Sequence, residues 1–201
     1  MTRCFHVALA SAVLCLAPSF AAIAQMPMPS QPTGQMPATQ MPMQQAKPVT
    51  EVSQALAAYN QTKQIIIGSA ELMPADKFSY KATPEIRTFA QMFTHVAQTQ
   101  MSICPVIAGT PPATRPVEST ATSKEEVLAV IKKSFDVCDA AYNSVTDANA
   151  MEVGGTGYMR GSKLGNMWKN VAHNNEMYGQ MVIYLRLNGL VPPSTAMRGR
   201  M

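Results

Sequence analysis

Two histidines are the residues of this sequence best suited to bind a metal ion. The 201-residue chain has three histidines and four cysteines, and neutral imidazole is a common ligand of divalent metals. His95 and His173 each lie about 110° from the centre of the apolar stripe of a predicted helix. This position allows both side chains to face one groove between helices, but it does not require it. The alternative for each is an ordinary residue at the edge of the core.

The sequence does not identify a catalytic residue. A Ser-His-Asp arrangement cannot be argued with two histidines, and Cys104 and Cys138 lack the features of an activated nucleophile. The third histidine, His6, and the other two cysteines fall in a segment that we expect to be removed. Whether the protein is an enzyme therefore stays open at this stage.

Residues 1–24 have the features of a signal peptide, which predicts an exported protein of the periplasm or cell exterior. Arg3 precedes an apolar run, and Ala22-Ile23-Ala24 resembles a signal-peptidase site. A stable membrane anchor is not expected, because Pro18 breaks the run short of the ~20 residues that a span needs. Lipid anchoring is disfavoured as well, since a leucine precedes Cys15 where a small residue is required.

Removal of the signal leaves roughly 175 residues, enough for one domain with a sizeable core. Loss of Arg3 lowers the formal charge from +4 to +3. The lysines and arginines are scattered, apart from Arg198 and Arg200 at the end of the chain. This distribution is not typical of nucleic-acid binding, so no nucleic-acid partner is expected.

Residues 25–49 are rich in Met, Pro and Gln and predict a disordered tether. The five methionines of this tether include two Met-x-Met pairs, and thioethers select Cu(I) in exported proteins. A copper site is the alternative interpretation. The tether is favoured because copper sites of this kind usually include histidine, and this segment has none.

Apolar residues at three- and four-residue steps predict a first helix over 50–73. Pro74-Ala75-Asp76-Lys77 ends it. A second helix is expected to begin at Thr83-Pro84-Glu85, which supplies a cap residue, a proline in the first turn and an acidic side chain. Pro105 should end or kink this second helix.

Two more helices follow a connection at 108–122 that has three prolines and no periodicity. Fifteen extended residues reach up to ~50 Å, so the connection can return along the whole second helix. Ser123 and Glu126 form a capping box that starts the third helix, which runs to about Val145. The fourth helix spans Gly161–Gly189, with an apolar stripe that includes Trp168.

The glycine-rich link at 154–161 is expected to connect the third and fourth helices. A phosphate-binding role would need a preceding strand, and no strand pattern occurs in the sequence. These elements together predict an all-α four-helix bundle with a long crossover between helices two and three.

Several segments together resemble the DinB family in its exported branch. They are Met73–Phe78, Thr83–Phe89, His95-Val96-Ala97 and His173–Gly179. The resemblance covers residues 50–195, with 196–201 as a disordered tail. It implies an up-down-down-up bundle in which one histidine of helix two and an H-x-x-x-H pair of helix four bind a divalent metal, zinc or nickel.

This resemblance assigns His95 and His173 as metal ligands and places Met177 at the third position. A thioether is a poor partner for zinc or nickel, so the expected site has two histidines and binds metal weakly or not at all. Glu176 is not a substitute, because at about 100° per residue it turns to the far side of His173 from the apolar stripe.

Two classes of function remain. One is an exported bundle that binds a small molecule or an envelope component in its groove, with an incomplete two-histidine metal site and no established catalysis. The other is a metal-dependent thiol S-transferase or hydrolase-like enzyme, as in some DinB relatives. A homo-oligomer is compatible with both classes.

Cys104 and Cys138 are expected to form a disulfide, because export places them where disulfides persist. Cys104 lies near the end of helix two and Cys138 in the later half of helix three. They approach only if these helices run parallel, as the crossover permits. Two buried free cysteines are the alternative.

Overall fold

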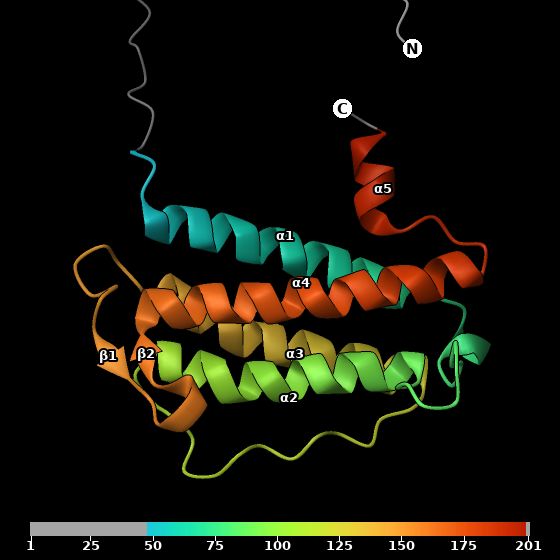
Figure 1. Cartoon of the computed structure of the whole chain (residues 1–201), viewed down its shortest axis with the longest axis horizontal. Coiled ribbons are helices and arrows are strands. Elements are labelled where there is room, and N and C mark those ends of the chain that lie inside the picture. Colours follow the sequence, from blue (N-terminus) through green and yellow to red (C-terminus); the bar gives the residue numbers. More distant parts are fainter. Residues whose placement is uncertain (1–47, 200–201) are drawn as a thin grey trace, which may run out of the picture. The chain divides into compact units, whose positions relative to one another are not determined.

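The computed structural model describes residues 48–199, which form a bundle of four long helices (Figure 1). These are α1 (Glu51–Leu72), α2 (Phe89–Ile107), α3 (Lys124–Asn143) and α4 (Lys163–Leu187). The expected all-α class is confirmed. The expected signal peptide and the expected tether up to residue 47 lie outside the described residues, as do residues 200 and 201. Within residues 48–199, none of the helices combines the length and apolar character that a membrane crossing requires.

Capping side chains start three of the helices where the sequence predicts. Thr50 caps α1 in a reciprocal box with Ser53, and Ser123 caps α3 in a box with Glu126. The Ser162 hydroxyl accepts a hydrogen bond from the backbone N–H of Gly165 at 3.0 Å and starts α4. Each cap satisfies backbone donors that the first turn of a helix leaves without a partner.

The expected start of the second helix at Thr83 is wrong, because α2 begins at Phe89. Thr88 is the cap: its hydroxyl accepts from the Gln91 N–H at 3.1 Å, and the Gln91 side chain accepts from the Thr88 N–H at 2.8 Å. This box satisfies two backbone donors at once. Pro105 lies inside α2, which ends two residues later at Ile107.

Helices α2 and α3 run parallel, and the other two run opposite to them. Gln100 pairs with Ser134, and Cys104 is bonded to Cys138; both pairs join residues 34 apart in sequence, which requires parallel helices. The Tyr59 hydroxyl in the first half of α1 donates to Asp139 near the end of α3, and Lys124 at the start of α3 donates to the Glu71 carbonyl at the end of α1, so α1 is antiparallel to α3. The expected up-down-down-up order is present.

Residues 108–122 form the crossover that returns the chain along α2 (Figure 1). The Gln98 side-chain amide donates to the carbonyl of Pro116 at 2.9 Å. The Thr94 hydroxyl, one turn earlier in α2, donates to the Glu118 carboxylate at 2.8 Å. The crossover therefore lies antiparallel to α2 and is attached to it at several points.

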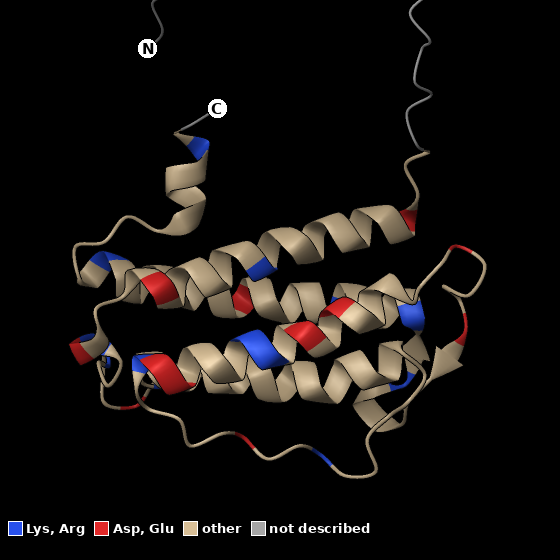
Figure 2. Cartoon of the chain, turned by 180° about the vertical axis from the view of Figure 1, so that it is seen from behind, with Lys and Arg blue, Asp and Glu red and all other residues tan. Residues whose placement is uncertain are grey.

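The core combines aromatic packing with a layer of buried amides. Tyr59 and Tyr142 stack at 4.0 Å between ring centroids. Asn166, Asn170 and Asn174 occur at four-residue steps on α4 and are all buried, so they face the interior together. Trp168, expected in the apolar stripe of α4, is instead 38% exposed. Acidic and basic residues are intermixed along the helices in Figure 2.

A two-residue antiparallel ladder closes the link between α3 and α4, although the sequence shows no strand pattern. β1 (Val153–Gly154) pairs with β2 (Gly161–Ser162) around a short 3-10 turn, Gly157–Met159. Gly155 has φ +72°, and a Cβ there would lie 2.5 Å from the Met159 carbonyl oxygen. The glycines of this link therefore allow a tight turn.

We expect Gly155→Ala to lower the free energy of unfolding by about 1 to 3 kcal/mol, because alanine adds both left-handed strain and a steric clash. Gly157→Ala is the matched control. Gly157 has φ +51°, but a Cβ there has no neighbouring atom within 4 Å, so only the strain remains. Urea unfolding of both variants measures the difference, and equal losses would contradict the steric account.

Helix α5 (Pro193–Arg198) includes residues 196–198, which the sequence analysis places in a disordered tail. The Tyr178 hydroxyl of α4 donates to the Ser194 hydroxyl at 2.8 Å and accepts from the Ser194 N–H at 2.9 Å. A Cβ at Gly68 of α1 would lie 3.4 Å from the Pro193 ring. Tertiary contacts therefore hold this short helix against the bundle.

Candidate functional site

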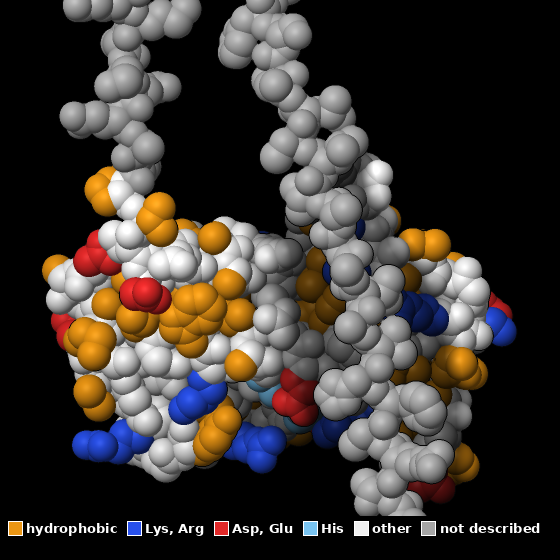
Figure 3. Space-filling model, turned by 45° about the horizontal axis from the view of Figure 1, so that its top comes forward, with side chains coloured by type: hydrophobic (Ala, Val, Ile, Leu, Met, Phe, Trp, Pro, Cys, Tyr) orange, Lys and Arg blue, Asp and Glu red, His pale blue; other side chains and the backbone are white. Residues whose placement is uncertain are grey.

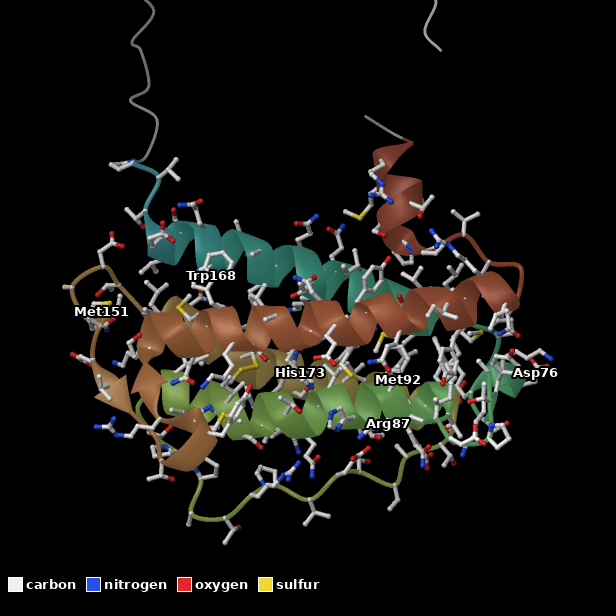
Figure 4. The ribbon with its side chains drawn as sticks, in the orientation of Figure 1. Asp76, Arg87, Met92, Met151, Trp168 and His173 are labelled. Carbon is white, nitrogen blue, oxygen red and sulfur yellow. A yellow bond between two sulfur atoms is a disulfide. The ribbon has the colours of Figure 1, made fainter. Side chains whose placement is uncertain are left out.

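The structure brings the two predicted ligands together between α2 and α4. The Nε2 atoms of His95 and His173 lie 3.4 Å apart, and the two rings are 5.2 Å apart between centroids. Figure 4 shows His173 in the space between the two helices. Both residues are partly buried, and in Figure 3 only a small area of histidine is visible at the surface, next to an acidic side chain.

Three further side chains contact the imidazoles. The Thr99 hydroxyl lies 3.4 Å from His173 Nε2. On the other face of the pair, Arg87 Nη2 lies 3.5 Å and Glu118 Oε2 lies 3.8 Å from His95 Nδ1. The histidine pair thus has its Nε2 atoms turned toward each other and one Nδ1 atom between a cation and a carboxylate.

The two groups beside His95 Nδ1 favour opposite tautomers. The Arg87 guanidinium can only donate, so it favours a lone pair on Nδ1 and the proton on Nε2. The Glu118 carboxylate accepts and favours the proton on Nδ1. A metal ion bound between the Nε2 atoms needs both lone pairs, so the His95 proton must lie on Nδ1, where the Glu118 carboxylate can accept it. Glu118 is therefore placed to favour the metal-binding tautomer.

The pKa values of both histidines lie below the ordinary range. For His95 the main cause is burial, followed by the charge of Arg87. For His173 it is burial, followed by the neighbouring His95. Glu118 acts in the opposite direction on the pKa of His95. Neutral imidazole, the form that binds metals, is therefore favoured at both positions.

In metal-free protein we expect the free energy of unfolding to fall as the pH drops below about 6.5, the ordinary histidine pKa. Because both folded-state pKa values are lowered, the unfolded chain binds more protons below that pH. The stabilising contribution is present above about 6.5 and is lost as the pH falls through the lowered values.

Urea unfolding between pH 5.5 and 7.5 with a chelator present measures this dependence. The matched control is the double variant His95→Gln, His173→Gln, which removes both titrating groups. An equally steep pH dependence in this variant would show that the histidines are not its cause.

A groove of about 620 Å³ opens beside the histidine pair. We call it the histidine groove. One wall is α2, through His95, Thr99, Ser102 and Val106; the opposite wall is residues 111–116 of the crossover. Tyr158 and Met159 of the link before α4 close one end, and His173 forms part of the floor. Its size and its mixture of apolar walls with a few polar groups are typical of small-molecule sites.

The spacing of the two histidines fits a metal ion, but the set of donors around them is incomplete. Two nitrogens about 2.0 to 2.1 Å from a tetrahedral zinc ion lie roughly 3.4 Å apart, and the Nε2 atoms have this separation. Within residues 48–199, however, no three His, Cys, Asp or Glu side chains are grouped to hold a metal. The pair would therefore supply two ligands to an ion.

The third position that the resemblance assigns lies in the core. Met177 is 3% exposed and packs with the buried apolar residues, and it does not line the histidine groove. It lies one helical turn after His173, on the same side of α4. Glu176 is exposed, in agreement with its expected direction away from the bundle.

The buried amides lie directly behind the histidine pair. Asn174 follows His173 in sequence and is fully buried, and neither its side-chain oxygen nor its nitrogen has a hydrogen-bond partner. Asn170 donates to the Tyr142 hydroxyl at 3.2 Å but leaves its oxygen without a partner. The α4 sequence did not indicate that these asparagines are buried, because asparagine is also common on the exposed face of a helix.

Sequence reasoning also missed Arg87, Thr99 and Glu118. Glu118 is the only acidic residue of the crossover, and a connection that returns along helix two must pass the side of His95. These two features together could have indicated that Glu118 passes near His95. Arg87 was assigned to helix two, whereas it precedes the helix and reaches back to His95.

The expected disulfide between Cys104 and Cys138 is present, so neither cysteine is available as a free thiol. Cys104 and Cys138 are bonded, with their Cα atoms 5.0 Å apart, and both are fully buried. Of the residues that the structure describes, these are the only cysteines. The described part of the chain therefore has no thiol nucleophile.

Comparison with known proteins agrees with this architecture. The model of a family described as the DinB superfamily matches residues 58–181. The crystal structure of a DinB-like protein from Bacillus cereus ATCC 10987 is similar, with a TM-score of 0.59 and 15% sequence identity over 69% of this chain and 93% of that chain. At this identity the similarity concerns the fold alone. No curated protein matches the chain.

Proposed function

The chain belongs to the DinB superfamily, and from this membership and the geometry of the histidine groove we propose that it is an exported binding protein. The groove takes a small molecule or part of an envelope component. His95 and His173 hold a divalent metal, zinc or nickel, only weakly. No catalysis is included in this proposal.

The observation that carries the proposal is an open groove that ends at a two-histidine pair. The groove has hydroxyl groups, a proline-rich wall and the Arg115 side chain, but within the described residues no thiol faces it. The Thr99 hydroxyl lies beside His173, but the Nδ1 atom of that histidine has no partner that would orient it as a base. Apolar walls with a few polar groups favour binding and orientation of a ligand. A covalent reaction would need a nucleophile that this arrangement does not supply.

His95 and His173 are the residues that would hold the ion. When bound, a divalent metal supplies a Lewis acid that attracts an oxygen, nitrogen or sulfur atom of a ligand. Two other side chains support the pair. The Thr99 hydroxyl lies beside His173 Nε2, and the Glu118 carboxylate can accept a hydrogen bond from His95 Nδ1 when the proton is there. Arg87 opposes the metal-binding tautomer of His95.

A metal-dependent thiol S-transferase or hydrolase is the second candidate. It is favoured by one feature: a pair of protein ligands leaves open positions on an ion, and the groove gives a substrate access to them. The two functions differ in the metal affinity that they require, since a metal enzyme must retain its ion.

Metal titration of the purified chain from residue 25 tests the proposal. We expect zinc and nickel to bind in the micromolar range or more weakly, and His95→Ala to abolish the binding. N-terminal sequencing of the exported protein tests the expected cleavage before Gln25. Stoichiometric zinc binding at sub-micromolar level would overturn the weak site and favour the enzyme.

A further inference from the structure

The histidine groove has one permanent charge, and that charge is positive. Among the residues that line it, Arg115 is ionised at every physiological pH, and none is a lysine, an aspartate or a glutamate. Hydroxyl groups of Thr99, Ser102, Thr114 and Thr156 also line the groove and can donate hydrogen bonds. The lining therefore provides a cation and several donors, and it contains no carboxylate that would repel an anion.

The neighbouring cavity, of about 740 Å³, differs in this respect. It is lined by Arg87 and by two carboxylates, Glu85 and Glu118. Arg87 and Glu118 both lie beside His95 Nδ1, so their opposite charges largely cancel for a ligand in the histidine groove. Glu176 is exposed, and like Glu118 it does not line the histidine groove. Of these two cavities, the histidine groove is the one with a lining that favours an anion.

Gln98 of α2 positions Arg115 beside the histidine pair. The Arg115 Nη2 atom lies 3.5 Å from the Gln98 side-chain oxygen, and Gln98 donates to the Pro116 carbonyl at 2.9 Å. Gln98 follows His95 by three residues, so both face the same side of α2. Arg115 forms no ion pair with any residue that the structure describes. Most of its five N–H donors are therefore available to a ligand.

An aromatic ring and a row of prolines supply the apolar part of the groove. Tyr158 is 78% exposed, but Lys169 holds it in place. The Lys169 Nζ atom lies 4.5 Å from the Tyr158 ring centroid and donates to the Tyr158 carbonyl at 2.6 Å. We call Pro111, Pro112 and Pro116, which also line the groove, the proline wall. A fixed aromatic ring and rigid proline rings suit a flat, apolar ligand.

We propose that the histidine groove binds a small aromatic monocarboxylate, with its carboxylate at Arg115 and its ring along the proline wall toward Tyr158. The guanidinium of arginine matches the two oxygens of a carboxylate in a bidentate pair. A phosphate monoester carries a charge of about −1.5 to −2 at pH 7, which one guanidinium does not neutralise. The inference rests on the proposed function, because it names the ligand class of the same groove. It needs no metal at the histidine pair.

Calorimetric titration with 2-naphthoate tests the inference. The purified chain from residue 25 is used with a chelator present, so that no metal ion at the histidine pair attracts the carboxylate. 2-Naphthamide is the uncharged comparison with the same ring, and 2-naphthyl phosphate is the more highly charged one. We expect naphthoate to bind more tightly than both. Its advantage over the amide should be at least about fivefold, the upper range for an exposed ion pair.

Two pairs of variants locate the ligand in the groove. Arg115→Gln should lower the naphthoate affinity by at least about fivefold and leave the naphthamide affinity unchanged. Arg186→Gln is the matched control, because it removes the same charge from an exposed arginine in the last turn of α4 that does not line the groove. Tyr158→Ala should weaken the binding of both probes, whereas Tyr158→Phe keeps the ring and should bind them as the wild type does.

Several results would overturn the inference. One is that naphthoate does not bind, or binds no more tightly than naphthamide or the phosphate. Another is equal naphthoate affinity in Arg115→Gln and Arg186→Gln, which would show that the carboxylate is not at Arg115. Unchanged affinity in Tyr158→Ala would show that the aromatic ring of the ligand lies elsewhere.

Failure of this inference differs from failure of the proposed function. If naphthamide binds as tightly as naphthoate, the carboxylate is refuted, but a small-molecule groove remains. If neither probe binds, the inference is refuted, and the metal titration alone tests the weak site at His95 and His173. Tight stoichiometric zinc binding refutes the proposed function. A preference for naphthoate that depends on Arg115 would still support the inference in that case, because it is measured without metal.

Discussion

Replacement of both Cys104 and Cys138 by alanine is expected to lower the free energy of unfolding by about 3 to 4 kcal/mol. The bond closes a segment of 34 residues, and a cross-link of this span restricts the unfolded chain by roughly that amount in the loop-entropy account. Both side chains are fully buried, so alanine also removes packed sulfur atoms. Urea unfolding of the variant and the oxidised wild type gives the difference.

Reduced wild-type protein is the control that separates the two contributions. It keeps both sulfur atoms but lacks the cross-link, so it should lose most of the same stability. If the reduced protein is as stable as the oxidised one, the loss in the alanine variant comes from packing and not from the bond. Two free thiols in the denatured, unreduced protein would show that the bond does not form.

Local sequence signals were sufficient for the starts of three of the four long helices. α1, α3 and α4 begin after Thr50, Ser123 and Ser162, close to the expected positions. The sequence analysis placed the α2 start at Thr83, whereas α2 begins after Thr88. The structure selects Thr88 through contacts that are distant from any capping pattern: the Phe89 N–H donates to the Tyr80 carbonyl and the Ala90 N–H to the Phe78 carbonyl, both at 2.9 Å.

Helical periodicity allowed His95 and His173 to face one groove, and the resemblance to the DinB family assigned them to one site. The path of the crossover along helix two indicated that Glu118 could pass near His95, but a segment without periodicity does not give the register that places Glu118 against Thr94 and His95. The helix α5 was missed for a related reason. Six residues are too few to form a stable helix alone, and α5 depends on Tyr178 and on contact with α1.

Met177→His is expected to raise the affinity for zinc or nickel by at least about 10- to 100-fold, the change that outer-shell substitutions alone can produce. Met177 lies one turn after His173, so an imidazole there lies on the same face of α4 and can supply a third nitrogen. Three nitrogens with one open position are a common arrangement of zinc sites. Isothermal titration of the wild type and the variant measures the gain.

Two further variants show whether the gain comes from one site. Adding His95→Ala to Met177→His should abolish it, because two imidazoles of α4 alone leave the ion half-coordinated. Met181→His places an imidazole at another buried position of the same helix and should gain nothing, since two turns separate it from His173. If Met177→His binds zinc no better than the wild type, position 177 does not reach the pair. His95 and His173 would then remain a two-ligand site, because no third donor could be added from α4 at that turn.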